Sequence, residues 1–216
     1  DPQGSSSRWL VKRPESSPEI HGVATYKAQA GITRSFALRL PAEVERVIVD
    51  TPAALPNHKL VEETRGADKI LVPVLPSDID IHAATRCIAD LLIQAKIQRS
   101  DNRLAVVANR VKQNTLVFKS LMRFLRSLGI PVAAVLRDSQ AYIRSADQGI
   151  GVHEMQESRV RRDLEQWESL VDWVEDRKSP EELAAEQSFL SGEQAELENP
   201  DVSGVPPADS QVSFGT

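Results

Sequence analysis

The sequence predicts a doubly wound α/β domain with a mostly parallel sheet, followed by a last helix and an acidic, disordered tail. Two observations predict the domain. Short, continuous apolar runs alternate with stretches of helical periodicity, and such runs are typical of strands buried on both faces of a parallel sheet. The chain also has 216 residues and a hydrophobic content of 41%, enough for one sizeable core. Strand–helix alternation favours the doubly wound class.

Strands and helices are predicted in turn along the chain. The strands are expected at residues 46–50, 69–74, 104–109 and 132–136, with a weaker fifth candidate at 19–24. The helices are expected at residues 31–40, 57–65, 78–98, 115–128, 139–147 and 158–177. No apolar run approaches the roughly 18 residues of a membrane span, so we expect a cytoplasmic protein with no membrane partner.

The C-terminal region differs from the rest in charge. Residues 179–216 contain eight acidic residues and no Lys or Arg. Removing these eight charges from the net charge of −5 leaves +3 for residues 1–178. Residues 180–197 favour a loose helix, and the chain from about Asn199 onward has too few large apolar residues to offset its ordering entropy. We therefore expect residues 178–216 to be a largely disordered acidic tail.

Polar residues follow each predicted strand, at the edge of an open parallel sheet where ligands bind. They are Asp50-Thr51-Pro52, the segment 75–78, Asn109-Arg110 and Arg137-Asp138. A strand-terminal carboxylate such as Asp50 can hold Mg²⁺ through water, because Mg²⁺ keeps several waters and needs only one or two carboxylates. Alternatively, Asp50 is the N-cap of the next helix.

Five segments in order give the chain a resemblance to a known family. They are DPQGSSSRWL at 1–10, VIVDTPAAL at 47–55, LVPVLPSDIDIHAA at 71–84, VVANRV at 106–111 and the LRDS…A…G run over 136–149. In this order and spacing they resemble the ParA/MinD family of deviant-Walker-A P-loop ATPases, on the ParA side. The resemblance covers residues 1–177 and implies one nucleotide-binding domain there.

The resemblance implies roles for individual residues. Asp1 matches the switch aspartate that positions the attacking water, and Asp50 matches the Walker B aspartate near Mg²⁺, with Thr51 and Pro52 in the same switch. Asn109 matches the asparagine that recognises adenine, whose edge offers a donor and an acceptor to an amide.

The remaining cofactor-binding candidates adjoin these positions. Arg110 follows Asn109, and Arg137 begins the loop that closes over the base in the family. The alternative for Asn109 is a turn residue that satisfies local backbone groups.

One part of the family pattern is absent from the 216 residues. No segment matches the deviant phosphate-binding loop K-G-G-x-G-K-[ST], whose amides and lysines hold the phosphates. We expect the chain to be an N-terminally truncated piece of an ATPase, lacking the P-loop strand and first helix, and inactive by itself. ATP and Mg²⁺ are then cofactors of the longer parent. The alternative is a non-catalytic remnant.

Basic residues give a second functional indication. Lys119, Arg123 and Arg126 are spaced by four and three residues opposite the apolar stripe of helix 115–128, and Arg144 follows. ParA-like proteins bind DNA without sequence preference as ATP-bound dimers, so the resemblance implies that these four residues contact DNA. A solvated helix face is the alternative reading for each.

The function expected from the resemblance is the segregation or positioning of DNA or protein cargo on the nucleoid by ATP-switched dimerisation. A ParB-like or cargo-adaptor partner is implied. The alternatives are a non-enzymatic interaction module on this fold and an amidotransferase- or ligase-like relative. No catalytic Cys or His constellation is visible, since Cys87 fits a packed thiol and the four histidines lack metal spacing.

Overall fold

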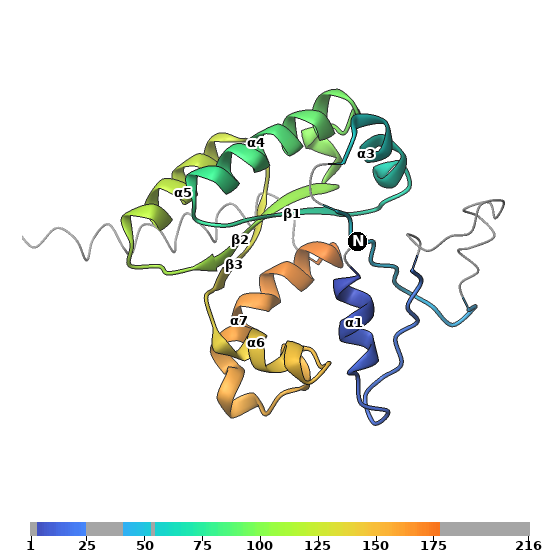
Figure 1. Ribbon diagram of the computed structural model, residues 1–216. Helices are drawn as coiled ribbons and strands as arrows, with labels where there is room; N and C mark the ends of the chain where they lie inside the picture. Colours follow the sequence, from blue (N-terminus) through green and yellow to red (C-terminus); the bar gives the residue numbers. More distant parts are fainter. Residues whose placement is uncertain (1–3, 25–40, 53–54, 178–216) are drawn as a thin grey trace, which may run out of the picture.

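The protein has an α/β fold around a small parallel sheet. The computed structural model describes residues 4–24, 41–52 and 55–177 (Figure 1). The sheet within these residues has three strands in the order β1-β2-β3, namely β1 (Ile70–Val74), β2 (Leu104–Val111) and β3 (Val132–Arg137). Both pairings are parallel, with Val72 opposite Val106 and Val106 opposite Val132.

Three of the described helices begin at side chains that the sequence provides as caps. Ser77, Thr115 and Ser139 each accept a hydrogen bond from a backbone N–H in the first turn of the helix that follows. The α-helices are α1 (Ser5–Val11), α3 (Asn57–Thr64), α4 (Asp78–Ile93), α5 (Leu116–Ser127), α6 (Gln140–Asp147) and α7 (Glu157–Val174), with 3₁₀ turns η2 (Arg99–Asp101) and η3 (Val152–Glu154).

The helices cover the sheet from two sides (Figure 1). On one side, α4 and α5 bury Leu91, Leu121 and Leu125 against the strands, and Leu60 of α3 packs against this core. On the other side, α7 places Leu170 and Trp173 against β2 and β3. A smaller cluster joins α6, η3 and α7 beneath. Because β2 is covered on both sides, nearly all of its residues are buried, as its apolar run predicts.

The described residues cover strand β1 on one side only. Val72 and Val74 are buried in the α4–α5 core, whereas Leu71 and Pro73 are exposed on the other face. The backbone N–H of Ile70 donates to Arg103 on the β2 side. Since N–H groups alternate in direction along a strand, the nitrogens of Leu71 and Pro73 face the edge where the described sheet ends. Pro73 has no N–H to donate there, which suits a strand at a sheet edge.

Two strand predictions were wrong. Residues 46–50 and 19–24 form no strand, although the predictions for 69–74, 104–109 and 132–136 are confirmed. Val47, Ile48 and Val49 are exposed, Ile48 by 93%. A β-branched run has strand propensity, but it needs a neighbouring strand to pair with, and the described sheet ends at β1.

The helix predictions hold within a few residues, with one exception. The helix expected at 78–98 stops at Ile93, because the backbone turns at Lys96, which has a φ of 54°. The helices expected at 31–40 and 180–197, and the acidic tail, lie outside the described residues. No helix within the described ranges is long and apolar enough to span a bilayer.

Candidate functional site

The carboxyl ends of β2 and β3 bring together several residues singled out from the sequence. Arg110, in a left-handed conformation with a φ of 51°, lies in an irregularity of the β2–β3 pairing directly after Asn109. Its Nε lies 3.3 Å from Oδ1 of Asp138, and the backbone N–H of Asp138 donates to the carbonyl of Val111 at 3.0 Å. These contacts join the carboxyl end of β2 to that of β3. Asn109, Arg110 and Asp138 therefore lie together at the carboxyl end of the sheet.

Asn109 lies at this carboxyl-terminal edge of the sheet. Its side chain is half-buried, and its amide makes no hydrogen bond to another described residue. The alternative role, an amide satisfying the local turn, is therefore not what the described residues show. An amide held at a strand end, with its donor and acceptor both available, can pair with a nucleobase edge.

Asp50 lies in the segment 41–52 and contacts α1. The hydroxyl of Ser6 donates to Oδ2 of Asp50 at 2.6 Å. The same segment is attached to the end of α7, where Arg46 Nη2 lies 2.8 Å from Oε2 of Glu175 and lowers the pKa of that carboxyl. Thr51 is exposed and Pro52 half-buried beside Asp50. Asp1, the second catalytic candidate, lies outside the described residues.

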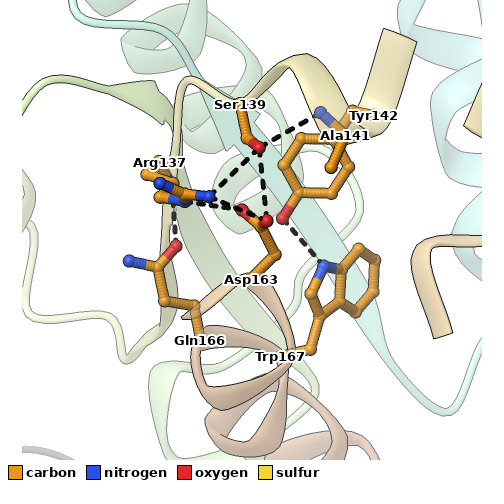
Figure 2. Close-up of polar contacts among 7 residues, drawn as sticks. All are labelled: Arg137, Ser139, Ala141, Tyr142, Asp163, Gln166 and Trp167. Carbon is orange, nitrogen blue, oxygen red and sulfur yellow. Dashed lines mark hydrogen bonds and ion pairs between the residues drawn. The ribbon is translucent and has the colours of Figure 1, made fainter. Parts of the chain in front are cut away.

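The structure directs the side chain of Arg137 toward α7 (Figure 2). Its Nε and Nη2 donate to the two carboxylate oxygens of Asp163 at 2.7 and 2.9 Å. Asp163 is fully buried, and its Oδ2 also accepts the hydroxyl of Ser139 at 3.2 Å. The hydrogen bonds to Asp163 raise the pKa of Arg137. Arg137 is thus committed in large part to holding the β3–α6 loop on α7.

Two further contacts complete this network. Gln166 accepts the backbone N–H of Arg137 at 2.8 Å, and Trp167 Nε1 donates to the hydroxyl of Tyr142 at 3.0 Å (Figure 2). The sequence analysis did not identify Asp163. Its signal was present, because Asp163 falls on the apolar stripe of α7 with Val160 and Leu170, and a carboxylate there requires a cation or several donors.

The four basic residues predicted to contact DNA do not form one surface. Lys119, Arg123 and Arg126 are exposed along α5, opposite its buried stripe, as their spacing predicts. Arg144 is exposed on α6, and α6 packs with α7 on the other side of the sheet (Figure 1). The prediction therefore separates into an α5 face and an α6 face.

The other chemically reactive residues are Cys87 and the side chains of types that could hold a metal ion. Cys87 is half-buried against the core, and burial raises the pKa of its thiol. Within the described ranges, no three His, Cys, Asp or Glu side chains gather so that they could hold a metal ion. The role of Asp50 beside Mg²⁺ needs only one carboxylate and water ligands, and it stays a prediction.

The comparisons with known proteins found two relatives at low identity. The chain is 24% identical to the maintenance of carboxysome distribution protein A of Halothiobacillus neapolitanus, over 72% of the chain and 71% of the relative. It is 27% identical to the protein of the same name from Gloeobacter kilaueensis, over 70% of the chain and 67% of the relative. No family model and no solved structure matches the chain. The chain is thus similar to proteins named for distributing carboxysomes, which supports the ParA/MinD resemblance in outline.

Proposed function

We propose that this chain is the nucleotide-binding part of a ParA-type ATPase that positions a protein cargo within the cell. The observation that carries the proposal is Asn109, whose amide has no described partner at the carboxyl end of a central parallel strand. Similarity to proteins named for carboxysome distribution supports positioning as the activity and a carboxysome-like compartment as the cargo.

The described residues fit the binding of ATP and Mg²⁺ in part. Asn109 would pair with the adenine edge, and the Arg110–Asp138 pair joins the neighbouring residue of β2 to the end of β3. Asp50 would hold Mg²⁺ through water, with the Ser6 hydroxyl orienting the carboxylate. The Mg²⁺ ion, when bound, neutralises charge on the phosphates. The amides and lysines that hold phosphates would come from a loop in a longer form of the protein, because no such motif occurs in the 216 residues.

A substitution at Asn109 tests the proposal in a longer form of the protein that contains a phosphate-binding loop. Asn109→Asp removes the amide donor but keeps the shape of the side chain, so we expect ATP affinity to fall by about tenfold, the value of one good hydrogen bond. GTP affinity should fall less, because guanine does not offer the same edge. The measurement is a competition titration of both nucleotides.

Asn114→Asp is the matched control, because this exposed residue lies in the next loop and introduces the same charge. It should leave both affinities unchanged. Equal ATP affinity for the Asn109→Asp variant and the unsubstituted protein would remove Asn109 from the site and with it the main support for the proposal.

A non-enzymatic interaction module is the second candidate, and one observation favours it: the absence of a phosphate-binding loop motif from the 216 residues. By our proposal the chain alone should bind ATP–Mg²⁺ negligibly, while a longer form with that loop binds it. Titration calorimetry on both forms separates the two candidates. A longer form without affinity for ATP would favour the interaction module, and micromolar affinity of the 216 residues would contradict the need for the loop.

The proposed mode of action includes an ATP-bound homodimer, contact with DNA without sequence preference, and a ParB-like or cargo-adaptor partner. The mild positive charge of residues 1–178 supports contact with DNA phosphates.

A further inference from the structure

A polar cavity lies where α6 meets the start of α7. Its volume is about 310 Å³, at the lower end of the range for small-molecule sites, about 300–1,000 Å³. Three arginines line it from three different elements, namely Arg137 at the end of β3, Arg144 on α6 and Arg159 on α7. The cavity is therefore built by the fold and not by one basic stretch of sequence.

The charges in the wall do not cancel. Arg137 is balanced by the buried Asp163, and the one carboxylate in the lining, Asp138, is paired with Arg110. Arg144 and Arg159 are exposed and make no side-chain hydrogen bond or ion pair with another described residue. Two guanidinium charges thus line one cavity without a described counter-charge, an arrangement that favours the binding of an anion.

The inner wall of the cavity is held rigidly. Asp163 binds both Nε and Nη2 of Arg137, which leaves Nη1 without a hydrogen bond to a described residue. The hydroxyl of Ser139 is fixed between Asp163 and the backbone N–H of Ala141, at 3.2 Å from each (Figure 2). The Nη1 of Arg137 is therefore a donor of fixed direction. Together with the two exposed arginines, Arg144 and Arg159, it suits a small polyanion with several acceptor oxygens.

We propose that this cavity binds a phosphate group through Arg144 and Arg159, with Nη1 of Arg137 as a further donor. A phosphate monoester carries a charge of about −1.5 to −2 near neutral pH, which matches the two uncompensated guanidinium groups. The phosphate could belong to a small phosphorylated molecule or to the DNA backbone. The first source stands apart from the proposed function, and only the second rests on it.

The test uses the full 216-residue chain and inorganic phosphate at constant ionic strength. The Nε–H signals of the arginines are followed by NMR during the titration. We expect the signals of Arg144 and Arg159 to shift together and to saturate. In the double variant Arg144→Gln/Arg159→Gln, phosphate affinity should fall by about tenfold or more, since two charge-assisted contacts are lost. Neither side chain has a described partner, so the fold should be unaffected.

The matched control is Arg161→Gln/Arg162→Gln, which removes the same amount of charge from positions of α7 that do not line the cavity. This variant should retain phosphate affinity. The proposal is overturned if phosphate produces no saturable shift at Arg144 and Arg159, or if the two double variants lose affinity equally.

A second arm uses the ATP-bound, longer form of the protein, which the proposed function requires for DNA contact, and replaces inorganic phosphate by a short mixed-sequence DNA duplex. Shifts at the same two arginines identify the phosphate as that of the DNA backbone. If DNA does not move these signals while inorganic phosphate does, the cavity is a site for a small phosphorylated molecule. Absence of DNA binding with phosphate binding retained would count against the DNA part of the proposed function and support the cavity.

Discussion

The carboxylate of Glu154 binds the guanidinium of Arg13 through both oxygens, with Nη2 of Arg13 2.7 Å from Oε1 and Nη1 2.9 Å from Oε2. The two residues are 141 positions apart in the sequence. Nη1 of Arg13 also donates to the carbonyl of Gly149 at 3.3 Å, and the backbone N–H of Gly151 donates to Glu154. The chain just after α1 is thereby attached to the loop between α6 and α7.

This contact predicts an acid-dependent loss of stability. The hydrogen bonds from Arg13 lower the pKa of Glu154 from 4.5 to about 2. Because the folded-state pKa is depressed, the stabilisation is complete above the unfolded pKa and is lost as the pH falls through about 2. The free energy of unfolding, measured in urea, should therefore decline between about pH 5 and pH 2, and this decline should be smaller in Glu154→Gln. The exposed Glu165→Gln variant should keep the slope of the unsubstituted protein.

The close approach of Gly149 to the backbone at Lys12 predicts that a larger residue at position 149 lowers the stability of the protein. A Cβ at this position would lie 2.4 Å from the carbonyl carbon of Lys12, and the residue has a φ of 68°. Gly149→Ala should lower the free energy of unfolding by at least the roughly 1–2 kcal/mol of a left-handed conformation. Gly66→Ala is the control, since a Cβ there meets nothing within 4 Å. Equal stability of the two variants in chemical denaturation would show that the backbone at Lys12 moves away from a Cβ at position 149 without loss of stability.

The buried ion pair predicts the largest effect on folding. Asp163→Ala removes the carboxylate that orders Arg137 and Ser139, and breaking a buried pair costs about 3–5 kcal/mol. Arg137→Met, which leaves Asp163 buried without its cation, should cost a similar amount. The double variant should be more stable than either single one, because no uncompensated charge remains. Additive losses in urea denaturation would indicate that the two groups contribute independently.

The separation of the basic residues predicts two distinguishable contributions to DNA binding in the ATP-bound, longer form. Reversing Arg123 and Arg126 on α5 and reversing Arg144 on α6 should weaken binding to mixed-sequence duplex by different amounts. Each variant should also make the salt dependence of DNA binding less steep, because fewer phosphates are neutralised and fewer counterions are released on binding. Filter or fluorescence binding across a salt series measures both. Unchanged DNA affinity of a variant with all three arginines reversed would show that the DNA-binding surface lies elsewhere.

The acidic tail predicts an effect of opposite sign. Deleting residues 179–216 removes eight negative charges that compete with DNA phosphates. DNA affinity of the longer form should therefore increase on deletion, most clearly at low salt. Unchanged affinity would leave the tail as a linker or an adaptor-binding segment.

The sequence predicted the parts of the fold that are decided locally. The starts of α4, α5 and α6 follow from Ser77, Thr115 and Ser139, because a cap acts within one turn of its own position. The segment 46–50 has strand propensity, but pairing depends on a neighbour distant in sequence, so its local pattern was misleading.

The candidate site divides in the same way. The strand-end residues Asn109, Arg110 and Asp138 were placed correctly at one edge, because parallel strands align their carboxyl ends. The partner of Arg137 could not be predicted in this way, since Asp163 comes from a helix 26 residues later in the chain. The spacing of charged residues also could not show that α5 and α6 lie on opposite sides of the sheet.

The proline in β1 has a consequence for the behaviour of the protein in concentrated solution. The unpaired N–H and C=O groups of an exposed edge strand can pair with a strand of another molecule, and repeated pairing of this kind leads to aggregation. Within the described sheet, Pro73 offers no donor on the outer edge of β1, so an incoming strand could accept a hydrogen bond from Leu71 but would find the ladder interrupted at the next outward-facing position. Pro73 thus limits how far an unwanted neighbouring strand can extend along the edge of β1.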